Sequence, residues 1–179
     1  MKQNTRYFVL SFILFLSLTG KAFAMAQDQL NEATIQLNSA IKEAELSLAH
    51  HQPGSGWTKQ HMQALLNILE GKQGKDFKLM NDTSKKEEDG EVLPLLTKTR
   101  EELKASKASV EVIQAMEGTI TFIEQAVEHA RMALRGKSAA DIHGHARMAA
   151  GMLVAAAGRS STDSPVTGNL EFVVRHFKE

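Results

Sequence analysis

A run of regularly spaced apolar residues between Ile113 and Leu134 constrains the fold more than any other feature of the sequence. The run steps by three or four residues without a break: Ile113, Met116, Ile120, Ile123, Val127, Ala130 and Leu134. This spacing places the side chains on one face of an α-helix. We therefore predict a helix over residues 109–135, with Ser109 as its N-cap and its apolar face packed against other helices.

Helical periodicity also dominates the rest of the chain after residue 25. It predicts helices at about 26–51, 57–70, 94–104 and 139–158, and a short tail helix with Leu170, Val173, Val174 and Phe177. Pro53-Gly54 and Gly71 are stop signals for the first two. The predicted fold is all-α: an antiparallel four-helix bundle built from two helical hairpins, at about 26–71 and 109–158, with short extra helices.

Residues 72–91 interrupt this pattern with a polar, lysine-rich segment that lacks helical periodicity. We predict a long loop there. Its acidic run, Glu87-Glu88-Asp89, lacks the alternating oxygen ligands of a calcium-binding loop, so a solvated loop is the preferred interpretation.

The first 24 residues have the composition of a signal peptide. Lys2 and Arg6 precede the apolar run Tyr7–Leu18, and Ala22-Phe23-Ala24 fits a small-x-small cleavage site. The alternative, a retained membrane anchor, is disfavoured because the run is short for a membrane span. We predict cleavage after Ala24, a single bundle domain over 25–179 and a periplasmic or secreted product without a membrane span.

Charge and motif content exclude several classes of function. Removing residues 1–24 takes away three basic residues and no acidic one, so the formal charge changes from 0 to −3. No basic stripe of the kind that binds nucleic acid is present. The chain also lacks a Gly-x-Ser-x-Gly elbow, a phosphate loop and the Glu-x-x-His spacing of di-iron bundles. We therefore predict a binding protein and not an enzyme.

The tetrapeptide His-Ala-Arg-Met occurs twice, at residues 129–132 and 145–148. The two copies lie equally far from a predicted turn near Lys137. Since every helical residue adds the same ~1.5 Å of rise, His129 and His145 should lie level on neighbouring antiparallel helices. A level pair of imidazoles is suited to a metal ion or a haem.

Two further histidines are predicted at the same end of the bundle. His51 ends the first helix and His61 lies near the start of the second, and imidazole is a common ligand of Zn, Cu and Ni. The axial positions of the four histidines spread over ~8–10 Å, so a site with two or three ligands is favoured over one with four. His143 would join His145 as a ligand only if the first turn of its helix frayed, because residues two apart point in opposite directions.

Each histidine also has a simpler interpretation, as a helix cap or a half-buried hydrogen-bonded residue. Met132 falls on the polar face and Met148 near the rim, so we interpret both as surface or packing residues and keep only Met62 and Met152 as candidate soft ligands. Covalent haem is excluded because the chain has no cysteine, which leaves non-covalent haem as an alternative.

The hairpin at 109–158, with the segment Val127-Glu128-His129-Ala130-Arg131-Met132-Ala133-Leu134, resembles the small periplasmic metal-binding helical bundles whose helices carry repeated histidines. The resemblance implies a bundle that binds a divalent metal or copper. The competing hypothesis is a structural or protein-interaction bundle without a ligand.

The leader hypothesis makes a direct prediction. Mass spectrometry of the exported protein should give an N-terminus at or within a few residues of Met25. Recovery of the chain with Met1 intact on membranes would contradict it.

Overall fold

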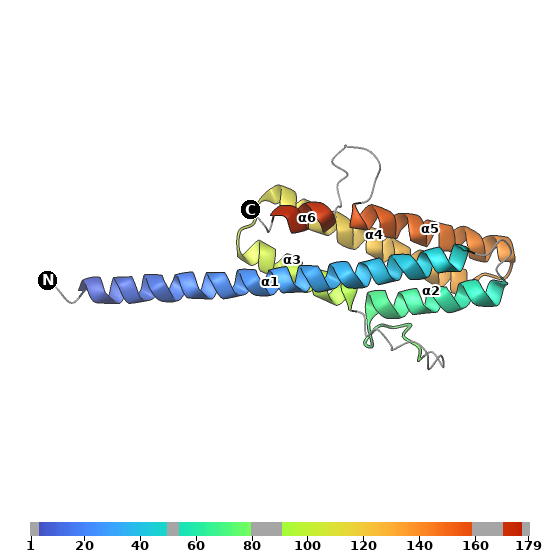
Figure 1. Ribbon diagram of the computed structural model, residues 1–179, viewed down its shortest axis with the longest axis horizontal. Coiled ribbons are helices and arrows are strands. Elements are labelled where there is room, and N and C mark those ends of the chain that lie inside the picture. Colours follow the sequence, from blue (N-terminus) through green and yellow to red (C-terminus); the bar gives the residue numbers. More distant parts are fainter. Residues whose placement is uncertain (1–3, 50–53, 80–90, 159–169, 177–179) are drawn as a thin grey trace.

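The computed structural model describes residues 4–49, 54–79, 91–158 and 170–176, with side chains from Met25 onward. Within these ranges the chain consists of helices and connecting turns and contains no strand, so the all-α prediction is confirmed. The helices are α1 (Asn4–Leu48), α2 (Ser55–Glu70), α3 (Val92–Ala105), α4 (Val110–Arg135), α5 (Ala139–Ala157) and α6 (Leu170–His176) (Figure 1).

Several helix boundaries follow the expected local signals. The Ser109 hydroxyl caps α4 by accepting a hydrogen bond from the backbone N–H of Val112 at 3.4 Å. α2 ends at Gly71, whose φ of 73° lies in the left-handed region that glycine adopts without steric cost. α3 begins at Val92, slightly before its predicted start, and Pro94 lies in its first turn, where no intrahelical hydrogen bond needs its missing N–H.

The first helix differs most from its prediction of 26–51. α1 begins at Asn4 and runs without interruption to Leu48, because no proline in this stretch stops helix propagation. Its N-terminal part extends beyond the other helices in Figure 1. At the other end Ala49 is already outside the helix, and His51 lies outside the described residues.

Two long helices organise the molecule. α1 packs against α2, α3, α5 and α6, and α4 packs against the same four helices. Within the described residues α1 and α4 do not contact each other. α2 and α3 follow one another along α1 (Figure 1). The shorter helices therefore separate the two long ones.

One apolar core takes residues from every helix. Its largest fully buried side chains are Leu30, Leu37, Met62, Leu65, Leu66, Leu69, Leu96, Met116, Ile123, Ile142, Leu153 and Leu170. The predicted face of α4 is buried through its middle, from Met116 to Ala130, and is partly exposed at Ile113 and Leu134. The periodic run in the sequence thus identified the core face of α4.

The segment after α2 is fixed to the helices by hydrogen bonds. Residues 72–79 form turns and extended chain, as predicted for the start of the loop. The Asn67 side chain donates to the carbonyl of Lys78 at 2.7 Å, and Arg131 contacts Asp76 at 2.6 Å and Glu70 at 2.7 Å. Burial raises the pKa of Glu70, and the positive charge of Arg131 opposes that shift.

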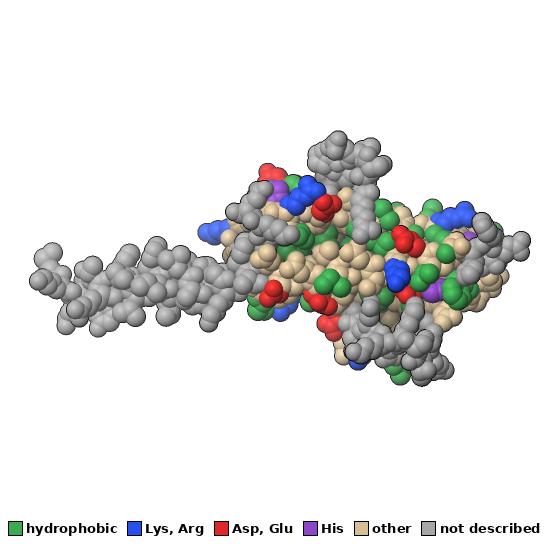
Figure 2. All heavy atoms as spheres, viewed as in Figure 1, with side chains coloured by type: hydrophobic (Ala, Val, Ile, Leu, Met, Phe, Trp, Pro, Cys, Tyr) green, Lys and Arg blue, Asp and Glu red, His purple; other side chains and the backbone are tan. Residues whose placement is uncertain are grey.

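Acidic and basic side chains are interspersed on the face shown in Figure 2. No helix among the described residues is long and apolar enough to span a membrane.

The core assignment predicts the effect of truncating one side chain of α4. Ile123 is 0% exposed, so Ile123→Ala should lower the free energy of unfolding by roughly 2–5 kcal/mol. Ile35 is 62% exposed, and Ile35→Ala should change it by less than ~0.5 kcal/mol. Chemical denaturation of both variants measures the difference. Equal effects would show that this face of α4 does not form the core.

Candidate metal centre

The candidate site depends on the close packing of α4 against α5, the most extensive helix–helix contact among the described residues. Both helices bury small side chains, and five of their alanines are 0% exposed: Ala126, Ala130, Ala133, Ala146 and Ala149. Ala130 and Ala146 are the second residues of the two His-Ala-Arg-Met copies. Because small side chains reduce the distance between helix axes, residues at the edge of this interface come into contact.

His129 and His145 are brought together at that edge. Their Nδ1 atoms are 3.3 Å apart, and their ring centroids are 5.5 Å apart with an interplanar angle of 26°. Both side chains are partly exposed. The structure therefore places these two residues side by side, as their equal distance from the turn predicts.

Asp141 lies on the opposite side of the His145 ring. Its Oδ1 is 3.4 Å from Nε2 of His145, and the side chains of His145 and Asp141 are 26% and 49% exposed. A carboxylate at one ring nitrogen favours the proton there and leaves the other nitrogen as a lone-pair donor. With its proton on Nε2, His145 would present the Nδ1 lone pair to His129. It is the arrangement found behind metal-bound histidines.

Two imidazole nitrogens that face each other repel if both present a lone pair. Either His129 carries its proton on Nδ1 and donates it to His145, or a cation binds both lone pairs. Two nitrogens ~2.05 Å from a tetrahedral ion are ~3.3 Å apart. The observed Nδ1–Nδ1 distance of 3.3 Å equals that separation.

The turn between α4 and α5 is built to hold Asp141 in place. Ser138 caps α5 by accepting a hydrogen bond from the backbone N–H of Asp141 at 3.1 Å. A Cβ at Gly136 would lie 2.7 Å from Cγ1 of Ile142 and 3.0 Å from Oδ2 of Asp141. A larger residue at this position would therefore require the Ile142 side chain to shift.

His61 has a different environment. Its Nδ1 donates to Oε2 of Glu43 at 2.6 Å, and the side chains of His61 and Glu43 are only 7% and 11% exposed. The ring of Trp57 packs edge-on against it with centroids 4.4 Å apart. Nε2 of His61 is buried and has no hydrogen-bond partner among the described residues. His61 therefore joins α2 to α1.

His143 also links helices. Its Nδ1 lies 3.2 Å from the hydroxyl of Thr58, which in turn donates to the carbonyl of Ser47 at 3.3 Å. The contact joins α5, α2 and α1. Since α5 is helical from Ala139, His143 and His145 point away from each other and do not form a chelating pair.

The predicted site of His129, His145 and His61 is not formed as one group. Among the described residues no three His, Cys, Asp or Glu side chains are grouped so that they could hold a metal ion. His61 is hydrogen-bonded to Glu43. Glu43 lies three residues after Ala40 on the apolar stripe of α1, so the sequence alone indicates that its side chain faces inward. Asp141 was equally detectable, because it precedes His145 by four residues on one helix face.

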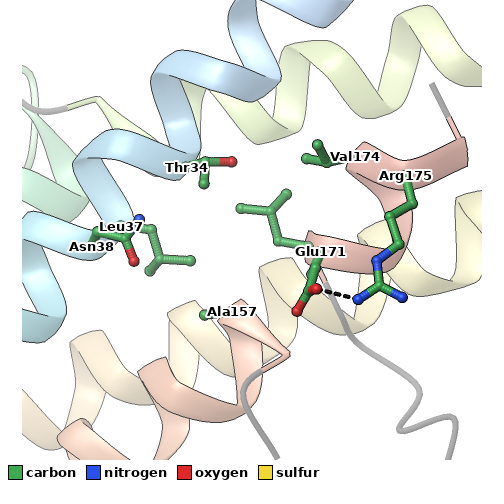
Figure 3. Close-up of a pocket in the computed structure, with 8 residues that line it drawn as sticks. Thr34, Leu37, Asn38, Ala157, Glu171, Val174 and Arg175 are labelled. Atoms are coloured by element: carbon green, nitrogen blue, oxygen red, sulfur yellow. Dashed lines mark hydrogen bonds and ion pairs between the residues drawn. The ribbon is translucent and has the colours of Figure 1, made fainter. Parts of the chain in front are cut away.

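A hollow lies between α1, α5 and α6 (Figure 3). It encloses about 400 Å³ and is lined by Thr34, Leu37, Asn38, Ala157, Leu170, Glu171, Val174 and Arg175. Its two charged residues, Glu171 and Arg175, form an ion pair with each other. They balance each other's charge at a solvent-exposed edge, so this hollow is a weaker candidate than the histidine pair.

Comparison of the chain with protein-family models, with curated proteins and with solved structures finds no match.

The His61–Glu43 contact predicts a stability effect. Glu43→Ala removes the acceptor and leaves a buried imidazole N–H without its partner, which should cost ~1–3 kcal/mol of unfolding free energy. Glu45→Ala on the exposed side of the same helix is the matched control and should have little effect. Thermal or urea unfolding compares them, and equal stabilities would show that the contact does not hold α1 against α2.

Proposed function

We propose that this chain is an exported, non-enzymatic helical protein that binds a transition-metal ion through His129 and His145. The observation that carries the proposal is the pair of Nδ1 atoms 3.3 Å apart with Asp141 behind one ring. The pair is partly exposed, so an ion reaches it without unfolding the hairpin.

The geometry favours a tetrahedral ion. Two adjacent ligands of a square-planar ion at the same bond length would be only ~2.9 Å apart, closer than the observed 3.3 Å. We therefore propose Zn(II) as the ion in preference to Cu(II) or Ni(II). A two-histidine site leaves further coordination positions for water or other ligands.

The architecture we propose is the antiparallel four-helix bundle. α1 and α4 each pack against the same four shorter helices. In the proposed bundle, α1 and α4 are two of the four helical positions. α2 followed by α3 forms the third position, and α5 followed by α6 forms the fourth. The hairpins α1–α2 and α4–α5 supply the largest contacts in this arrangement.

Export is proposed from the signal-peptide pattern, in which Lys2 and Arg6 precede an apolar run and Ala22-Phe23-Ala24 fits a cleavage site. Cleavage after Ala24 would start the mature bundle at Met25, in a periplasm or outside the cell.

The second candidate is a structural or protein-interaction bundle without a ligand. A long N–H···N hydrogen bond between His129 and His145 also fits 3.3 Å, and His61 and His143 already act as links between helices. Non-covalent haem is not favoured by this geometry. Two axial histidines stand on opposite faces of the macrocycle, and these nitrogens face each other directly.

Metal titration decides between the first two candidates. His129→Ala and His145→Ala should each weaken Zn(II) binding by at least ~10-fold, since even residues that only orient a ligand contribute 10–100-fold. Asp141→Asn should weaken binding while leaving both imidazoles in place. Zn(II) affinity should also decrease as the pH is lowered, because only neutral imidazole binds the ion. Competition with a chromophoric zinc chelator measures each affinity.

His176→Ala is the matched control, because that ring lies on α6, where it packs against Phe172 and its Nδ1 contacts the Phe172 carbonyl. It should bind Zn(II) like the wild type. If the wild type and the His129 and His145 variants bind Zn(II), Cu(II) and Ni(II) equally weakly, the metal function is wrong. Destabilisation of these variants without metal would then favour the structural candidate.

A further inference from the structure

The hollow between α1, α5 and α6 has the size of a site for a small molecule. Its volume of about 400 Å³ lies within the range of pockets that hold small ligands. α6 packs mainly against α4 and only lightly against α1 and α5, which leaves the space open. Leu170 and Val173 fix α6 in place, since they are 1% and 0% exposed. The walls of the hollow are therefore packed helices from three distant parts of the sequence.

The inner surface of the hollow is aliphatic. Leu37 of α1 and Leu170 and Val174 of α6 line it, and Ala157 adds a small side chain from the end of α5. In Figure 3 the side chains of Leu37 and Val174 point toward the space between the helices. An aliphatic group placed here would exchange water for apolar contacts, which favours its binding.

Both signs of charge lie together at the rim. Glu171 and Arg175, one turn apart on α6, form an ion pair between Oε1 and Nη2 (Figure 3). A carboxylate has a second oxygen and a guanidinium has five N–H donors, so each partner keeps capacity for a further hydrogen bond. The side chains of Glu171 and Arg175 are 49% and 73% exposed, so a dissolved molecule reaches both charges.

The walls next to Glu171 favour a positive group of the ligand. Thr34 of α1 lines the hollow, and its hydroxyl donates to the carbonyl of Leu30 at 2.7 Å. The lone pairs of that hydroxyl therefore remain to accept an N–H from a ligand. α5 ends at Ala157 beside the hollow, and the C-terminal end of a helix carries partial negative charge. In the view of Figure 3, Glu171 lies between Ala157 and Arg175.

This distribution of charge selects one class of ligand. A molecule with a single charge would meet a like charge in either Glu171 or Arg175. A zwitterion meets an opposite charge at both, and an aliphatic group on it would contact the inner surface.

We propose that the hollow binds an apolar amino acid with an aliphatic side chain. Its ammonium group lies toward Glu171 and the end of α5, its carboxylate lies toward Arg175, and its side chain contacts Leu37, Leu170 and Val174. The lining residues do not include His129, His145 or Asp141. Ala157 lies ~18 Å along α5 from His145, so this site is separate from the proposed metal centre.

The test titrates the purified chain with L-leucine in a calorimeter and follows the backbone amides by NMR. Three partial analogues each lack one feature: glycine has no aliphatic group, 3-methylbutanoate has no ammonium group and 3-methylbutylamine has no carboxylate. We expect L-leucine to shift the amide signals of residues that line the hollow. Glycine should bind at least ~10-fold more weakly, because it buries no aliphatic surface. The other two should bind roughly 5-fold more weakly, which is the upper contribution of a solvent-exposed charge pair.

Variants of the chain test the same contacts from the protein side. Glu171→Gln and Arg175→Gln each remove one charge at an exposed position and should each weaken L-leucine binding roughly 5-fold. Ala157→Leu places a larger side chain into the hollow and should abolish binding, with thermal unfolding as the check that the variant folds. Arg147→Gln is the matched control, because Arg147 is an exposed residue of α5 that does not line the hollow. It should bind L-leucine like the wild type.

The outcomes are decisive for the ligand class. No binding at ~10 mM L-leucine overturns the inference, since a Kd of ~1 mM would give near saturation there. Equal affinities for L-leucine and 3-methylbutanoate, or for L-leucine and 3-methylbutylamine, would show that the site does not recognise a zwitterion. Binding that is unchanged in Ala157→Leu would place the ligand elsewhere and would also overturn the inference.

Discussion

The candidate site depends on one constraint, the short distance between α4 and α5. Fully buried alanines on both helices set that distance, and the glycine at position 136 lets the first turn of α5 approach the end of α4. A larger side chain at Ala130 or Ala146 would push the helices apart. The imidazoles, which lie at the edge of the interface, would then separate first. The close approach of His129 to His145 is therefore a property of the backbone as much as of the rings.

The described histidines near this end of the molecule differ in what lies on each side of the ring. His145 has a carboxylate at one nitrogen and a second imidazole at the other. His61 has a carboxylate at Nδ1 and a buried, unpartnered Nε2. His143 contacts a hydroxyl that also bonds the α1 backbone. The first environment suits an ion, and the other two suit helix packing. The number and spacing of histidines in the sequence do not reveal this difference in surroundings.

Most of the fold was accessible from local sequence patterns. The apolar spacing gave the core face of α4, and Ser109 and Gly71 gave helix ends, because these signals act within a few residues. The level placement of His129 and His145 followed from counting residues outward from one turn. What failed depended on tertiary contacts. The spacing places Glu43 on the inner side of α1 but does not identify His61 as its partner. The contacts of Arg131 with Glu70 and Asp76 join residues far apart in sequence, which periodicity does not relate.

The level arrangement has a consequence for chain length. A single residue inserted between Arg135 and Ala139 would move His145 by ~1.5 Å along its helix and rotate it by ~100°, which is enough to turn its ring away from His129. The number of residues in this turn therefore determines whether His129 and His145 meet, whereas the identity of most of these residues does not. Tolerance to insertions should be lowest here, at a surface turn, where loops ordinarily accept them most easily.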